Sequence, residues 1–428
     1  MQSMHLVLGA ALLSWQAAVP AAHAMGQQSV STSPPALTLE RAVAMAMAAN
    51  PSLRAATRAV GIADGAVLQA GARPNPELSV STEGTERRTR TETAQLSQVL
   101  ELGGKRAARV AVARQERGAA LAQVAVRRAE LRADVVAAYL DALTAQERQA
   151  LALAAVDLAH RATLVTGRRV AAGKLSPVEE TRSAVAEAGA RLDLEQARAD
   201  LALSRRRLAA LWGATAPFTQ ALDEPDAALL RLPPWDDLQA RLEDAPQLRA
   251  AHAALDGHAA RAQLERTRRV PDVTLSVGAQ RERDAGRSQG VLGVAVPLPL
   301  FDRNQGNLLA ALRRTDQARD ELEAERLRLR AALADAYERA QLAAAQQDAL
   351  RERIVPAAQG AYDAAVTGFE LGKFAFTDVL DAQRTLFQAR TQALRALADR
   401  YRALAELQRL VPTRPADADA DYHEGALR

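Results

Sequence analysis

The 428-residue chain contains no cysteine. This absence excludes disulfides, thiolate metal sites, catalytic thiols and a lipid-modified N-terminal cysteine. Aromatic residues are scarce as well, at 3% of the chain, although hydrophobic residues make up 48%. Globular cores usually depend on large aromatic side chains. A chain poor in them but rich in Ala, Leu, Arg, Glu and Gln is instead typical of long helices packed closely through small side chains.

Long apolar runs and a large charge excess are also missing. Beyond the N-terminal region, no stretch reaches the roughly 18 consecutive apolar residues that a membrane helix needs. Any membrane span would therefore have to consist of strands. The 55 basic and 51 acidic residues are interleaved in sign along the chain, which indicates solvated helix faces and argues against a nucleic-acid partner.

The N-terminus predicts a secretory signal peptide over residues 1–24. Leu6 to Trp15 form an apolar segment, and Ala22-His23-Ala24 is a small-x-small cleavage site. The residues before the apolar segment include no Lys or Arg, which departs from the usual pattern. A buried N-terminal helix is the alternative, and Pro20 disfavours it.

The chain is an internal duplication. Four landmarks of the first half recur in the same order 195 to 199 residues later: Pro51-Ser52-Leu53-Arg54-Ala55-Ala56 as Pro246-Gln247-Leu248-Arg249-Ala250-Ala251, Pro76 as Pro271, Ala138-Tyr139 as Ala336-Tyr337, and Gly173-Lys174 as Gly372-Lys373. We therefore expect two repeats, 38–212 and 234–412, joined by a linker at 213–233. Tails at 25–37 and 413–428 flank them.

Each repeat predicts a helix, a strand hairpin, a very long helix, a glycine turn and a second helix. The expected ranges are hairpins at about 76–101 and 271–299, long helices at about 104–171 and 304–370, and following helices at 177–211 and 376–411. The first helix of the chain, over 39–73, is expected to break near Pro51, and Pro356 is expected to kink the second long helix. At 1.5 Å per residue, each long helix would extend about 100 Å. Such a length favours a coiled-coil-like assembly.

The hairpins alternate apolar and polar residues with the period of a strand, the first less regularly than the second. In the second hairpin, Val273, Leu275 and Val277 alternate with Thr274 and Ser276. Strands of about ten residues suit a tilted membrane span. Four strands cannot close a barrel, and lipid tolerates no open sheet edge, so three chains with twelve strands are expected. The alternative is a pair of soluble hairpins.

Taken together, these features resemble the outer-membrane efflux protein (TolC-like) family over residues 38–412. The most specific motifs are the turns Ala172-Gly173-Lys174-Leu175-Ser176 and Leu371-Gly372-Lys373-Phe374-Ala375, the second followed by Thr377-Asp378-Val379-Leu380-Asp381-Ala382-Gln383. The first copy departs from the pattern at Pro177-Val178-Glu179-Glu180. The junctions at 100–106 and 299–306 look like the heavy-metal (cobalt–zinc–cadmium) branch.

The resemblance implies a mainly α fold with a small β part. A long α-helical coiled-coil barrel would join four transmembrane strands per chain, which form a 12-stranded barrel in a homotrimer. It implies an outer-membrane channel of a Gram-negative bacterium, extending into the periplasm, in contact with outer-membrane lipid. Its implied partners are a periplasmic membrane-fusion adaptor protein and an inner-membrane RND pump. The implied cargo is heavy-metal cations, with drugs or other small molecules as an alternative, and a soluble periplasmic coiled-coil scaffold is the alternative to a channel.

Two groups of residues carry roles implied by the resemblance. The adaptor-docking tips comprise Gly173, Lys174, Leu175, Ser176, Gly372, Lys373, Phe374 and Ala375. Asp378 and Asp381, three residues apart on one helix face, would form a periplasmic gate ring. A focused negative potential there would attract cations. The alternative is that these acids only complement the helix dipole, and that the glycines only end helices.

No enzyme is expected. His160, His252, His258 and His423 lack the i, i+4 spacing of paired metal ligands on a helix, so neither a tight metal site nor a cofactor is predicted. No convergent set of catalytic residues is visible.

Overall fold

The computed structural model describes residues 36–84, 86, 90–225 and 231–411. The predicted signal peptide, most of the first tail and the tail at 413–428 lie outside these residues. The first half contains α1 (Leu39–Ala49), α2 (Pro51–Gly71), β1 (Glu77–Glu83), β2 (Thr91–Leu100), α3 (Lys105–Ala171) and α4 (Pro177–Ala210). The second half contains α5 (Trp235–Arg241), η2 (Leu242–Asp244), α6 (Pro246–Thr267), β3 (Val273–Glu282), β4 (Arg287–Ala295), α7 (Gln305–Ala349), η3 (Leu350–Ile354), α8 (Val355–Glu370) and α9 (Phe376–Leu410).

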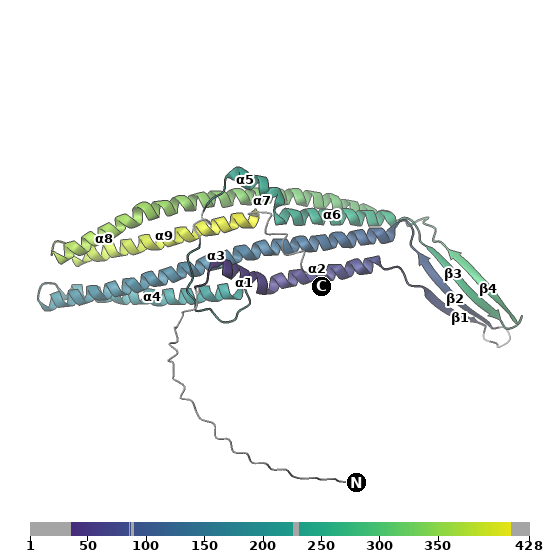
Figure 1. The fold of residues 1–428 in the computed structure, drawn as a ribbon, viewed down its shortest axis with the longest axis horizontal. Helices are drawn as coiled ribbons and strands as arrows, with labels where there is room; N and C mark the ends of the chain where they lie inside the picture. Colours follow the sequence, from purple (N-terminus) through teal and green to yellow (C-terminus); the bar gives the residue numbers. More distant parts are fainter. Residues whose placement is uncertain (1–35, 85, 87–89, 226–230, 412–428) are drawn as a thin grey trace, which may run out of the picture. The chain divides into compact units, whose positions relative to one another are not determined.

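The helices of the two halves lie side by side. α3 packs on α2 and α4 from its own half and on α6 and α9 from the other half, while α7 packs on α6 and α9 (Figure 1). Among the described residues, no helix combines the length and apolar character that a membrane crossing would need.

Local sequence sets the break between α1 and α2. Asn50 ends α1, and its side-chain oxygen accepts hydrogen bonds from the backbone N–H groups of Ser52 (2.9 Å) and Leu53 (3.0 Å). Pro51 then occupies the first helical position, where its missing N–H costs no intrahelical hydrogen bond. The break expected near Pro51 therefore lies at Asn50.

A π-turn, a feature that often accompanies a helix kink, lies directly before Pro356 in the second long helix. η3 spans Leu350–Ile354, and Pro356 lies in the first turn of α8. A π-turn changes the hydrogen-bond spacing from four to five residues, so the chain continues as a helix past a residue that lacks a backbone donor.

The four strands form one antiparallel sheet in the order β1-β2-β3-β4. The hairpins of the two repeats therefore join through β2 and β3, where Leu96 lies opposite Val277. β1 has seven residues, fewer than the ten expected. β4 ends at Ala295, short of the expected residue 299, because Pro297 and Pro299 have no N–H to donate to a neighbouring strand.

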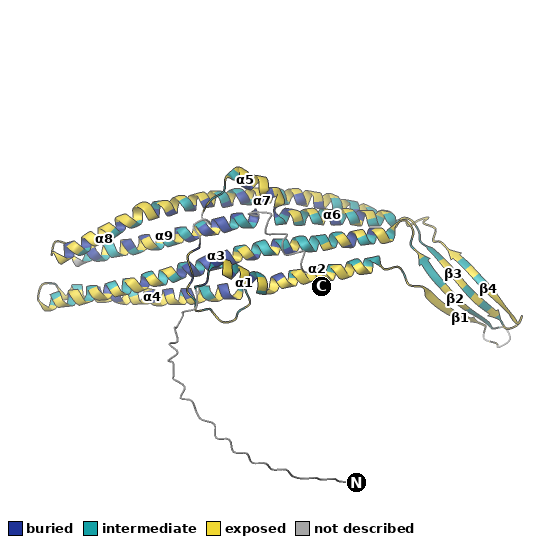
Figure 2. Cartoon of the chain, in the orientation of Figure 1, coloured by how far each residue is buried: buried dark blue, intermediate teal, exposed yellow. Residues whose placement is uncertain are grey.

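The helical core lies along α3, α7 and α9 and depends on Leu, Val and Ala (Figure 2). Tyr139 is a fully buried exception. Its hydroxyl lies 2.7 Å from the carbonyl oxygens of Leu37 and Asp223, and burial raises its pKa above the ordinary range. Its repeat counterpart, Tyr337, instead packs edge-on against Trp235 with ring centroids 5.3 Å apart.

Candidate functional site: the helix tips and the sheet

The two glycine turns have the same backbone structure. Gly173 (φ +69°) and Gly372 (φ +72°) follow α3 and α8 in the left-handed region, which L side chains rarely adopt. In the first turn the Lys174 N–H donates to the Arg169 carbonyl (2.8 Å), and in the second the Lys373 N–H donates to the Gly368 carbonyl (2.8 Å). Both are Schellman-type helix ends, so the repeat relation inferred from sequence extends to the turn geometry.

The predicted tip side chains occupy different positions around these turns. Lys174, Ser176 and Lys373 are exposed, and Leu175 is half-buried. The Ser176 hydroxyl caps α4 by accepting from the Val178 N–H at 3.3 Å.

In the second turn, the Phe374 ring covers the backbone of Gly368. A Cβ placed on Gly368 would lie 2.1 Å from Cδ2 of that ring. The position therefore requires glycine for Phe374 to pack in this way. Half of the Phe374 side chain remains exposed, and the Ala375 N–H that follows donates to Asp378 at 2.9 Å.

A contact between Arg169 and Phe369 links the two tips, and we call it the tip clasp. The guanidinium carbon of Arg169 in α3 lies 4.1 Å from the centre of the Phe369 ring in α8. The same guanidinium donates to the Phe369 carbonyl oxygen at 3.3 Å. Phe369 is buried and packs with Ala365 and Val379. The clasp therefore joins the α3–α4 hairpin to the α8–α9 hairpin.

The predicted gate residues lie in the first turns of α9. Asp378 and Asp381 are both exposed. Asp378 accepts the Ala375 N–H and so caps the start of α9. Asp381 has no ion pair among the described residues, and no helix end requires it. Both carboxylates remain accessible to solvent and to cations.

A polar cluster lies further along α3 and α4. The Glu187 carboxylate in α4 is buried and contacts His160 Nδ1 at 3.0 Å and the Arg191 guanidinium. The hydrogen bond from His160 lowers the pKa of Glu187, and Arg191 lowers it further. In the described part of the chain, no group of three or more His, Asp or Glu side chains could hold a metal ion.

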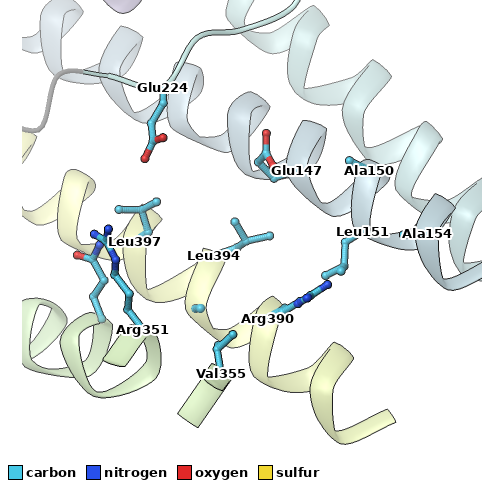
Figure 3. A pocket seen from close by; sticks show the side chains of 12 residues that line it. Glu147, Ala150, Leu151, Ala154, Glu224, Arg351, Val355, Arg390, Leu394 and Leu397 are labelled. Carbon is cyan, nitrogen blue, oxygen red and sulfur yellow. The ribbon is translucent and has the colours of Figure 1, made fainter. Parts of the chain in front are cut away.

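A groove of about 540 Å³ separates α3 from α9 beside the π-turn η3. Figure 3 shows that Glu224 extends into it from one wall and Arg351 from the other. Glu147, from α3, and Arg390 and Leu394, from α9, also line the groove. The groove leaves space between the two helical hairpins at this level.

At the other end of α3, the strand–helix junction is tightly held. The backbone N–H of Leu102 donates to Asp272 at 3.1 Å, and Lys105 forms an ion pair with the same carboxylate at 2.7 Å. Gly103 has φ +69°, and a Cβ there would lie 2.7 Å from the Cβ of Val270. These contacts hold the link between β2 and α3 against the residues that precede β3.

The sheet has two chemically different faces. One carries two cross-strand apolar rows, Leu78–Leu96–Val277–Leu292 and Val80–Ala94–Ala279–Gly290. The other carries polar rows, among them Ser81–Thr93–Gln280–Gln289. The apolar face is solvent-exposed in the single chain, with Leu292 at 83%. Such a face needs an apolar environment.

Sequence reasoning missed the tip clasp and the ring packing at Gly368. For the clasp, the sequence offers only a weak signal: Arg169 and Phe369 lie four and three residues before the turn glycines. Nothing in the sequence pairs residues 200 positions apart.

Comparison with known proteins supplies the remaining evidence. The sequence profile described as "Outer membrane efflux protein" matches residues 42–214 and 238–412. The cobalt-zinc-cadmium resistance protein CzcC of Cupriavidus metallidurans is 44% identical over 376 residues, which cover 88% of this chain and 90% of that protein. The nickel-cobalt-cadmium resistance protein NccC of Alcaligenes xylosoxydans xylosoxydans is 30% identical over 311 residues, covering 71% and 70%. The solved structure of the outer membrane protein VceC from Vibrio cholerae has the same fold, with a TM-score of 0.71 at 22% identity over 87% of this chain and 95% of that chain.

Proposed function

Since this chain belongs to the outer membrane efflux protein family, we propose that it is the outer-membrane channel of a tripartite efflux system that exports heavy-metal cations. In this role the chain is a passive conduit from the periplasm to the exterior. It catalyses no reaction, and an inner-membrane RND pump supplies the energy.

The channel proposal rests on the chemical difference between the two faces of the sheet. Every strand contributes apolar side chains to one face and polar side chains to the other. In a membrane barrel the apolar face contacts lipid and the polar face lines water. A sheet on a soluble scaffold would have to cover its apolar face with helices, and the exposed Leu292, Val277 and Val80 have no such cover.

The free sheet edges favour a homotrimer. β1 and β4 each pair on one side only, and unpaired backbone groups are costly in lipid. β4 of one chain next to β1 of the following chain continues the antiparallel alternation. Three chains then give twelve strands, an even number that closes around a water-filled lumen.

An exposed apolar stripe on α4 supports the same assembly. Val178, Val185 and Leu192 recur every seven residues and are 57%, 67% and 71% exposed. Apolar residues at one position of each heptad make up one of the two rows of a coiled-coil seam. We assign this stripe to a helix of the neighbouring subunit.

The tips suit docking onto a periplasmic membrane-fusion adaptor protein. The exposed Lys174 and Lys373 and the half-exposed Phe374 project from rigid Schellman turns. An aromatic side chain such as Phe374 is of the kind enriched in protein interfaces, and the two lysines add positive charge for electrostatic complementarity with a partner.

The gate ring suits a cationic cargo. In a trimer, Asp378 and Asp381 would place six carboxylates around the periplasmic mouth, and a ring of carboxylates favours cations over anions. The names of the two relatives refer to resistance to cobalt, cadmium, zinc and nickel, which supports metal cations as the cargo. Opening would separate the α8–α9 hairpin from α3, breaking the tip clasp and using the space of the groove.

The proposal is tested by ion selectivity in planar bilayers. The double variant Asp378→Asn/Asp381→Asn removes the charges but keeps an acceptor for the Ala375 N–H, so the start of α9 stays capped. We expect a lower cation-to-anion permeability ratio and lower tolerance of zinc and cobalt in cells that carry the adaptor and pump. Asp363→Asn, an exposed acid of α8, is the matched control and should change neither.

The outcomes separate the parts of the proposal. Unchanged selectivity in the double variant would contradict the gate-ring role of Asp378 and Asp381 but not the channel function. A purified trimer that gives no conductance and no insertion into bilayers would contradict the channel itself.

A further inference from the structure

A row of exposed apolar side chains continues beyond the last strand. Leu298, Leu300 and Phe301 are 74%, 64% and 91% exposed, and Phe301 is the most exposed large hydrophobic side chain of the described residues. They follow β4 directly, on the side of the sheet where the helices begin. The Leu300 N–H donates to the Leu298 carbonyl at 2.9 Å, so the backbone turns tightly within this segment.

The paired part of the sheet is too short to cross a membrane by itself. Its apolar rows run from Ala279 to Val273 along β3, seven residues whose six steps span about 20 Å at ~3.3 Å per step. A strand tilt of about 40° reduces this height to roughly 15 Å, whereas the apolar band of membrane barrels is about 25 Å tall.

The missing height can come from only one end. At the loop end, the row after Ala279 places Arg281 beside Glu92, and Arg283 forms an ion pair with Glu92 at 2.8 Å. This charged row closes the apolar band there. At the helix end, the exposed Leu292 and Val294 of β4 are followed along the chain by the exposed apolar side chains of Leu298 and Leu300.

Polar residues follow Phe301 directly in the chain and mark the end of the apolar band. The Asn304 N–H donates to Asp302 at 2.9 Å, and the Arg303 N–H donates to the side chain of Gln305 at 2.8 Å. The change from apolar to polar therefore occurs within two residues. In membrane barrels the apolar band is likewise flanked by aromatic residues at the membrane interface.

We propose that Leu298, Leu300 and Phe301 form a lipid anchor that inserts into the periplasm-facing leaflet of the outer membrane. The anchor rests on the proposed channel function and extends it: it sets the depth at which the sheet sits in the bilayer. Its partner is the acyl-chain boundary of the lipid. A neighbouring subunit covering the same residues is the competing occupant, which the experiment distinguishes.

The test uses the absence of cysteine from the chain, because a single introduced cysteine is then the only thiol. The full-length variants L298C, L300C and F301C carry a bimane label in phosphatidylethanolamine–phosphatidylglycerol vesicles. L292C reports on the apolar sheet face, and F374C, at the helix tips, is the control. Each label is exposed separately to nitroxide-bearing lipid and to aqueous iodide.

We expect a blue shift and a loss of emission with nitroxide lipid at positions 298, 300 and 301, as at 292, and quenching by iodide alone at 374. Labels at 298, 300 and 301 that are quenched by iodide, or shielded from both quenchers between subunits, overturn the anchor. If position 292 still reports lipid, the channel proposal survives that result. If position 292 also reports water, the channel proposal fails as well. Three anchor positions are used so that misfolding of one variant does not decide the outcome.

Discussion

Breaking the tip clasp should favour opening of the channel. In Arg169→Gln the guanidinium over the Phe369 ring is lost, together with its hydrogen bonds to the Phe369 carbonyl oxygen. A cation–π contact is worth about 0.5–2 kcal/mol, and the hydrogen bonds, at 3.3 Å, are long. We therefore expect the closed state to lose about 1–2 kcal/mol per subunit.

This loss converts into a measurable shift of the gating equilibrium. Since each 1.4 kcal/mol is a factor of about ten, the ratio of open to closed states should rise roughly 5- to 30-fold for each subunit. A concerted opening of three subunits multiplies the factor. The assay is the open probability of single channels in planar bilayers without adaptor.

Two comparisons make the reasoning refutable. Arg168→Gln removes the same charge from an exposed position of the same helix turn and should leave gating unchanged. Phe369→Leu removes the ring but keeps the carbonyl. Because both substitutions remove the same contact, the double variant with Arg169→Gln should raise the open-to-closed ratio by less than the two single effects combined. Equal open probabilities for the Arg168 and Arg169 variants, or strictly additive effects, would show that the clasp does not hold the gate.

Two further predictions concern stability. Gly103→Ala should destabilise the strand–helix junction by about 1–2 kcal/mol because of the left-handed φ and by a further ~1–3 kcal/mol because of overlap with Val270. Gly104→Ala is the control: this residue has φ +74° and open space around it, so only the first cost should apply. Equal shifts of the heat-dissociation temperature in the two variants would refute the packing argument. Glu187, whose pKa is lowered in the folded chain, should stabilise the fold above the ordinary glutamate pKa of about 4.3 and lose that contribution as the pH falls through its lower folded pKa. Glu187→Gln should therefore flatten the acid limb of a thermal-unfolding series, and an unchanged pH slope would contradict the assignment.

The sequence determined the local elements of this protein because their causes lie within a few residues. The proline-free stretch up to Pro177 and its helical periodicity predicted α3, and Gly173 and Gly372 located the two turns because only glycine adopts their φ readily. Period-two alternation located the hairpins, although their ends followed finer features such as Pro297. The fold class and the efflux family inferred from these motifs are confirmed by the comparisons.

The tertiary structure decided which distant segments meet. β2 pairs with β3 along an edge that joins residues about 180 positions apart, and Arg169 meets a phenylalanine 200 positions away. It also decided the environments of the repeat-related Tyr139 and Tyr337. The Tyr139 hydroxyl is buried beside carbonyl oxygens, whereas the Tyr337 ring packs against a tryptophan. Local propensities act over a few residues, whereas the pairing of distant segments minimises the free energy of the whole chain, so no pattern within a single element encodes these contacts.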